Sequence, residues 1–146
     1  ILTSSDGISW TSRTSGTAQP LRGVNYGGNI FVTAQDSGTF LTSSNGGISW
    51  VSYSAGTSKQ LMKVTYGENI FVAVGLSGTI ILSSNGTAWT SSSSGTSQYL
   101  GGVTFGGSTF VAVGWFGTIL TSSDGISWTS RTSGTGNSLN GVTYTE

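Results

Sequence analysis

The sequence contains no cysteine and no histidine. Their absence excludes disulfides, thiolate chemistry, Cys/His zinc sites and any mechanism that uses imidazole as a base. Only 7% of the residues are charged, and five basic residues balance five acidic ones. A neutral chain has no electrostatic footprint for nucleic acid or for an anionic membrane, and no apolar run is long enough to span a bilayer. We therefore expect neither nucleic-acid binding nor membrane insertion.

Large apolar residues recur along the chain at a fixed spacing. Gly- and Ser-rich sequences are often disordered, but a disordered chain does not keep such a period. The sequence therefore predicts a folded array of repeats of about 39 residues. Spacings of 40, 39 and 39 residues hold for four sets of residues: Trp10, Trp50, Trp89 and Trp128; Leu21, Leu61, Leu100 and Leu139; Val24, Val64, Val103 and Val142; Tyr26, Tyr66, Phe105 and Tyr144.

Each repeat divides into four short segments rich in β-branched and aromatic residues. In one repeat these segments are 102–105, 109–113, 118–121 and 126–130, which we denote strands A to D. Gly, Gly-Gly or Asp-Gly follows strands A, B and C. This pattern predicts four antiparallel strands joined by tight hairpins, and no helix is expected.

Four antiparallel strands per repeat of this length are typical of the blades of a β-propeller. A β-solenoid is the main alternative, but its coils usually have shorter periods and parallel strands. One small sheet cannot bury its own faces, so the repeated Trp and Leu residues are expected to pack between blades. We predict a single domain over 1–146, divided into strands C and D of a partial blade (1–17), three blades (21–57, 61–96 and 100–135) and strand A of a shared or closing blade (139–146).

The strand order predicts fifteen strands, one fewer than four blades require. Residues 1–17 are identical to residues 119–135, which indicates recent duplication of the repeat. We therefore expect part of a larger array, or a homo-oligomer whose chains share blades, rather than a self-closed monomer.

The turn between strands C and D carries a recurrent motif. Residues 43–50 read Ser-Ser-Asn-Gly-Gly-Ile-Ser-Trp, and residues 122–128 read Ser-Ser-Asp-Gly-Ile-Ser-Trp. They resemble the Asp-box (BNR) motif Ser-x-Asp-x-Gly-x-Thr-Trp of sialidase-like propellers, although Ser replaces Thr and three copies are one residue shorter. The whole repeat is similar to YVTN-type arrays and, more distantly, to photosystem II assembly-factor propellers. The resemblance implies that four residues stabilise turns and are neither catalytic acids nor metal ligands: Asp6, Asn45, Asn85 and Asp124.

No set of residues has the pattern of an active site. A sialidase needs three convergent arginines, but Arg13 and Arg131 occupy the same position in different repeats, which leaves Arg22 alone. No two carboxylates form the opposed pair of a glycoside hydrolase, and no base is available to activate a serine. We expect no enzymatic activity, no metal and no cofactor.

A ligand site is best sought where the repeats differ. At the B–C turn one repeat has Trp115-Phe116 where the others have Asp36-Ser37 and Leu76-Ser77. Two interpretations are open: the pair binds a sugar ring or a protein partner, or Trp115 packs against the neighbouring blade. The D–A loops differ as well and are expected on the same face. They contribute the remaining candidate ligand-binding residues: Gln19, Gln60, Gln98, Tyr99 and Asn137.

These observations favour a non-catalytic binding or scaffold module, lectin- or adhesin-like, that recognises a glycan or a protein. The first alternative is a purely structural array in an extracellular or virion-associated assembly. The second is a fragment of a sialidase-like glycoside hydrolase. We expect the protein outside the cell, or on a cell or virion surface.

Overall fold

The computed structural model describes residues 1–145, so Glu146 lies outside the described part of the chain. These residues form three four-stranded antiparallel sheets and a two-stranded N-terminal hairpin. The hairpin pairs β1 (Leu2–Thr3) with β2 (Thr11–Ser12). Blade 1 comprises β3 (Leu21–Gly27), β4 (Ile30–Gln35), β5 (Thr39–Ser43) and β6 (Val51–Ser54). Blade 2 comprises β7 (Leu61–Gly67), β8 (Ile70–Gly75), β9 (Ile80–Ser83) and β10 (Thr90–Ser92). Blade 3 comprises β11 (Leu100–Gly106), β12 (Thr109–Gly114), β13 (Ile119–Ser122) and β14 (Thr129–Arg131).

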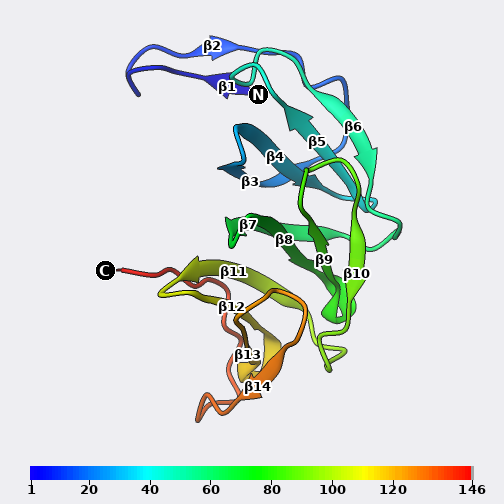
Figure 1. Ribbon diagram of the computed structural model, residues 1–146, viewed down its shortest axis with the longest axis vertical. Coiled ribbons are helices and arrows are strands. Elements are labelled where there is room, and N and C mark those ends of the chain that lie inside the picture. The colour runs from blue at the N-terminus through cyan, green and yellow to red at the C-terminus, as the bar shows by residue number, and fades with distance from the viewer. Residues whose placement is uncertain (146) are drawn as a thin grey trace.

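The sheets follow one another along the molecule, each with its strands in sequence order (Figure 1). The first strands of the three blades, β3, β7 and β11, lie on one side, and β6 and β10 lie on the other (Figure 1). This arrangement confirms the all-β propeller architecture with four-stranded antiparallel blades. No helix within residues 1–145 is long and apolar enough to cross a membrane.

Several strand and turn boundaries differ locally from the sequence prediction. Strand D of blade 3 begins at Thr129 instead of residue 126, because the N–H groups of Ile126 and Ser127 donate to the Asp124 carboxylate. Two B–C turns contain single 3₁₀ turns, η1 (Leu76–Gly78) and η2 (Trp115–Gly117), where no helix was expected. Thr79 follows the first of these turns and Thr118 follows the second. Each threonine donates two hydrogen bonds to the carbonyl of the turn's first residue, one from its N–H and one from its hydroxyl, and these bonds close the turn.

The hydrophobic core lies between the blades. Val32 and Ala34 of β4 are fully buried against Leu61 and Val64 of β7. The next interface repeats this packing: Val72 and Val74 of blade 2 lie against Leu100 and Val103 of blade 3. Blade 2 contributes one face to each of these two interfaces, and blades 1 and 3 contribute one face each, so the core is formed between sheets.

The repeated tryptophans occupy these interfaces unequally. Trp89 of blade 2 stacks on Phe40 of blade 1, and Trp128 packs against the core between blades 2 and 3. Trp50 is half-buried, with its ring centroid 6.5 Å from that of Phe31. Trp10 departs from the expected interior position, because its side chain is 58% exposed.

Residues 139–145 differ from the sequence prediction, which placed a strand over 139–146. They form no strand, because no second strand lies beside them to complete a ladder. They nevertheless follow β11: Leu139 N–H donates to the Gly114 carbonyl at 2.9 Å, and the ring of Tyr144 covers Gly106. The equivalent rings of Tyr66 and Phe105 cover Gly27 and Gly67.

Candidate ligand-binding face

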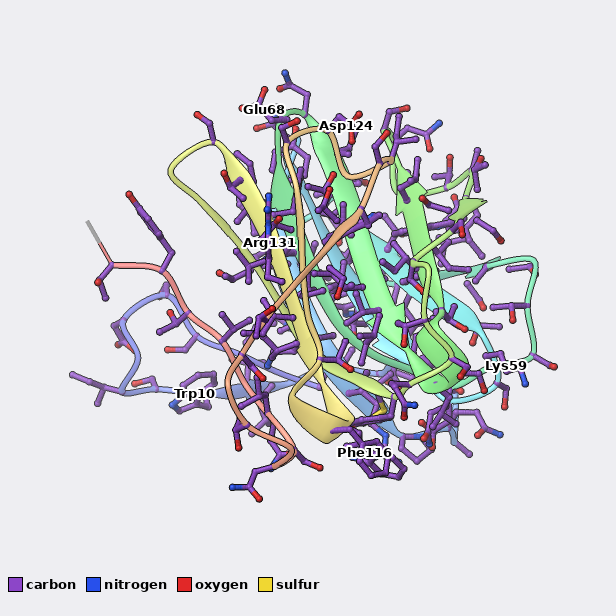
Figure 2. The ribbon with its side chains drawn as sticks, turned by 90° about the horizontal axis from the view of Figure 1, so that it is seen from below. Trp10, Lys59, Glu68, Phe116, Asp124 and Arg131 are labelled. Carbon is purple, nitrogen blue, oxygen red and sulfur yellow. The ribbon has the colours of Figure 1, made fainter. Side chains whose placement is uncertain are left out.

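The B–C turns and D–A loops meet at one end of the blades, which we call the loop face. Backbone hydrogen bonds of 3.0 Å join them, from Leu76 to Gln60 in blade 2 and from Trp115 to Tyr99 in blade 3. Phe116 and Lys59 lie at this end, whereas Glu68 and Asp124 lie at the other (Figure 2). The loop face therefore presents the residues that vary most between repeats.

The D–A loops share one backbone conformation and differ in their side chains. In every loop a threonine hydroxyl accepts a hydrogen bond of 3.0–3.1 Å from the N–H two residues later. This ST turn fixes the backbone and leaves the variable side chains free. The residues held in this way are Gln19, Lys59, Gln98 and Asn137.

Trp115 packs against Tyr99 from the adjoining D–A loop. Their ring centroids are 5.0 Å apart with an interplanar angle of 40°, a favourable tilted geometry. Trp115 remains 46% exposed and Tyr99 is half-buried. Trp115 therefore packs on Tyr99, which directly precedes β11 of the same blade, and still presents an aromatic surface to solvent. That this surface binds a ligand stays a prediction.

Phe116 is largely exposed to solvent. Its side chain is 69% exposed, and its backbone lies in the left-handed region with φ of 54°. A bulky residue in this region costs roughly 1–2 kcal/mol relative to glycine. The small residues Ser37 and Ser77 hold the same conformation in the other blades.

Phe116 also lines a groove of about 480 Å³ on blade 3. Thr118 and Leu120 supply one part of its lining, and the chain from Ser130 to Thr135 supplies another. The lining is largely hydroxyl and backbone groups, so the groove offers hydrogen bonds beside an exposed aromatic ring.

Arg131 gives this groove a positive charge. Its Nε donates to the Thr121 hydroxyl at 2.9 Å, which orients the guanidinium. Within residues 1–145 it forms no ion pair, because the one salt bridge there joins Arg22 and Asp36. The terminal guanidinium nitrogens are therefore available to an acidic ligand group.

Arg22 and Asp36 form this ion pair on blade 1. Two hydrogen bonds of 2.9 and 3.0 Å give it bidentate geometry. The bond from Arg22 lowers the pKa of the Asp36 carboxyl, and the side chain of Gln60 lowers it further. The pKa of Arg22 is raised by this hydrogen bond and then by the charge of Asp36.

Gln35 was not among the residues predicted for the site. Its side chain is 1% exposed, and its Nε2 has no hydrogen-bond partner among the described residues. The equivalent residues are Gly75 and Gly114, where a Cβ would clash with the carbonyls of Gln60 and Tyr99. Blade 1 accommodates Gln35 through a looser loop, since the Asp36–Pro20 backbone bond lengthens to 3.4 Å. Comparing Gln35-Asp36 with Gly75-Leu76 in the sequence would have revealed this substitution.

The predicted site residues do not form one cluster. Trp115, Phe116 and Tyr99 gather on blade 3, and Gln60 lies beside Asp36 between blades 1 and 2. Gln19 and Asn137 lie exposed on the first and last D–A loops. The predicted residues that lie together are therefore Trp115, Phe116 and Tyr99, beside the groove of blade 3.

The four Asp-box-like turns are held by their own hydrogen bonds, and the turn of Asp124 lies at the end opposite the loop face (Figure 2). The Asp124 carboxylate accepts bonds of 2.8 Å from the N–H groups of Ser127 and Ile126 and one of 2.9 Å from the Ser122 hydroxyl. These bonds, in that order, lower its pKa from 3.8 to about 2. Asp6 has the same partners in its own turn, and its pKa is likewise about 2. The carbonyls of Asn45 and Asn85 accept equivalent backbone bonds.

No group of three acidic residues that could hold a metal ion occurs within residues 1–145. The Asp124 carboxylate, which its own turn already hydrogen-bonds, lies at the end opposite the loop face (Figure 2). The groove of blade 3 offers apolar contact at Phe116, hydrogen bonding, and one cation, Arg131.

Comparison with known proteins places the chain by its fold. No protein-family model and no curated protein sequence matches it. YCF48 from Cyanidioschyzon merolae superposes with a TM-score of 0.70 at 19% identity, over 83% of this chain and 39% of that one. A structure of YCF48 bound to D1 peptide gives 0.69 at 17% identity, over 92% and 47%. The computationally designed Ika4 protein gives 0.67 at 15% identity, over 90% and 83%. The chain thus spans less than half of either YCF48 chain, and these likenesses show that its fold is that of a β-propeller.

Proposed function

We propose that the protein is a non-catalytic recognition module that binds a polypeptide segment at the loop face of blade 3. The observation that carries this proposal is Phe116, a bulky side chain that is 69% exposed on a left-handed backbone. The turn does not require a large side chain, since Ser37 and Ser77 take the same backbone conformation in the other blades. Strain retained at an exposed position favours a role in binding.

The surroundings of Phe116 favour a polypeptide ligand. Exposed aromatic residues are the usual anchors of protein interfaces. The groove beside Phe116 adds hydroxyl and backbone groups for a peptide main chain, and Arg131 adds a cation for an acidic side chain. That a protein of the same fold, YCF48, has been seen bound to D1 peptide supports the plausibility of peptide binding by such blades.

A glycan is the less favoured ligand. Sugar recognition requires planar polar groups placed beside an aromatic face. Gln19 lies on the first D–A loop and Gln60 lies beside Asp36, so of the four predicted amides only Gln98 and Asn137 belong to loops that border the groove of blade 3. We also propose that the protein acts outside the cell or on a cell or virion surface.

Selection from a displayed library of random short peptides, with a glycan array in parallel, tests this function. We expect enriched peptides that combine an apolar residue with an acidic one and whose binding weakens in Phe116→Ser. The matched control is Ile126→Ser, which removes another exposed apolar side chain at the opposite end of the blades. Glycan binding that depends on Trp115 and Tyr99, without peptide enrichment, would overturn the proposal.

A further inference from the structure

The turn that joins β9 to β10 departs from two of its counterparts at three positions. Residues 83–89 read Ser-Ser-Asn-Gly-Thr-Ala-Trp, whereas residues 4–10 and 122–128 both read Ser-Ser-Asp-Gly-Ile-Ser-Trp. The residues that differ are Asn85, Thr87 and Ala88. They create Asn-Gly-Thr, the only Asn-x-Ser/Thr sequence in the chain and an acceptor sequence for N-linked glycosylation. Such a short motif often arises by chance, so the structure of the turn has to show whether the asparagine is available.

The side-chain amide of Asn85 holds the turn through its oxygen alone. Oδ1 accepts hydrogen bonds of 3.0 and 2.9 Å from the N–H groups of Thr87 and Ala88. It also accepts one of 3.1 Å from the Ser83 hydroxyl. The hydrogen bonds of Asn85 within residues 1–145 end on this oxygen or on its backbone N–H, so Nδ2 has no partner there. Nδ2 can remain without a protein partner because Asn85 is exposed to water.

Asn45, the other asparagine at this position of the turn, has an occupied amide nitrogen. Its Nδ2 donates to the Ser49 hydroxyl at 2.8 Å. In the blade 2 turn Ala88 takes the place of Ser49, directly before the tryptophan, and offers no hydroxyl to accept this bond. Of the two asparagines, the one that lies in the Asn-x-Thr sequence is therefore the one whose amide nitrogen is unbound.

We infer that Asn85 is a site of N-linked glycosylation. The donor is a sugar carried on a diphosphate, such as a lipid-linked oligosaccharide, and a glycosyltransferase catalyses the transfer. Nδ2 forms a bond to C1 of the sugar and loses one proton, while the bond from C1 to the diphosphate oxygen breaks and the diphosphate leaves. Because only Oδ1 takes part in the hydrogen bonds of the turn, the glycosylated side chain keeps all of them.

A glycan on Asn85 lies away from the loop face. β9 begins after the B–C turn Leu76–Gly78 on that face and ends directly before the turn of Asn85, so the glycan is attached at the other end of blade 2. The inference rests on the part of the proposed function that places the protein outside the cell, because N-linked glycosylation is found on secreted proteins. It does not depend on peptide binding at blade 3.

Glycosylation of the folded protein in vitro is the first test. The unmodified chain is incubated with a soluble N-glycosyltransferase and UDP-glucose, and the modified residue is identified by peptide mass spectrometry. We expect one hexose per chain, on Asn85, and an unchanged urea midpoint of unfolding. Thr87→Ser should still be modified. Thr87→Ile, which introduces the residue of the other repeats, should fold normally and remain unmodified.

Expression of the chain behind a secretory signal in a eukaryotic cell line is the second test, and the added signal makes it independent of where the natural protein resides. Release of the glycan by peptide N-glycosidase in heavy-oxygen water should convert Asn85 to a labelled aspartate in the wild type and in Thr87→Ser, but not in Thr87→Ile. The glycosylated protein should bind a library-selected peptide as tightly as the unmodified protein does.

Three results would overturn the inference: no glycan on Asn85 in this cell line, modification of the unfolded chain alone in vitro, or a lower urea midpoint after modification. A chain that is glycosylated at Asn85 but binds no selected peptide would instead refute the peptide site of blade 3 and support the glycosylation site. The two proposals therefore fail separately.

Discussion

The indole ring of Trp89 lies flat on the phenyl ring of Phe40, with 3.5 Å between ring centroids and 8° between planes. The two residues belong to adjacent blades, so this contact joins sheets that share no hydrogen-bonded strands. The Trp89 Nε1–H donates to the Gly86 carbonyl at 3.2 Å, which satisfies the polar end of the ring within its own turn.

Trp89→Ala should destabilise the protein by about 3–5 kcal/mol, since it removes a large side chain from an interface between blades. Trp10→Ala, the same change at a side chain that is 58% exposed, should cost less than about 1 kcal/mol. Urea unfolding followed by circular dichroism measures both. Equal losses would show that Trp89 does not join the blades.

Gly67→Ala should destabilise the protein by about 1–3 kcal/mol, because a Cβ at this position overlaps the ring of Phe105 from the next blade. Gly141 has no atom within 4 Å of the equivalent position and no positive φ, so Gly141→Ala should be nearly neutral. Thermal unfolding of the two variants makes the comparison. A neutral Gly67→Ala would contradict the close approach of the blades.

Asp124→Asn should reduce the sensitivity of the fold to acid. Folding lowers the pKa of Asp124 from 3.8 to about 2, so its stabilising contribution is full above about pH 4 and is lost as the pH falls through 2. An asparagine carbonyl accepts equivalent bonds at Asn85 and does not titrate. Urea midpoints measured between pH 5 and pH 2 should therefore fall less steeply in the variant. If the urea midpoint of the variant depended on pH as that of the wild type does, the negative charge of Asp124 would not stabilise this turn.

The repeat pattern predicted the architecture because each feature it used is local. Gly-containing turns end strands such as β3 at Gly27, and β-branched and aromatic residues fill the strands between them. The pattern misplaced the start of strand D because Ile126 looks like a strand residue but its N–H donates to Asp124. It also missed the 3₁₀ turns, which depend on threonine side-chain bonds within three residues.

The candidate site was predictable only in part. Trp115-Phe116 departs from the repeat visibly, but the partnership of Trp115 with Tyr99 depends on how a loop folds back. The Arg22–Asp36 pair and buried Gln35 lie on two strands whose register brings them together. These residues occur together in blade 1 alone, so the period of the repeat does not predict that they meet.

Phe116→Ser should leave the stability of the protein unchanged or raise it by up to about 1 kcal/mol. The side chain buries little surface, and Ser77 already holds the same backbone conformation with φ of 56°. Chemical denaturation of the variant against the wild type measures this difference. A loss above about 1 kcal/mol would assign Phe116 to packing and weaken the case for a binding role.

The most direct test of the proposed function is the affinity of a library-selected peptide for three proteins: the wild type, Phe116→Ser and Ile126→Ser. Isothermal titration should show at least a roughly tenfold loss of affinity in Phe116→Ser, the loss expected for an exposed aromatic anchor. Ile126→Ser should bind like the wild type. Unchanged binding by Phe116→Ser, or equal weakening in both variants, would contradict recognition at the loop face of blade 3.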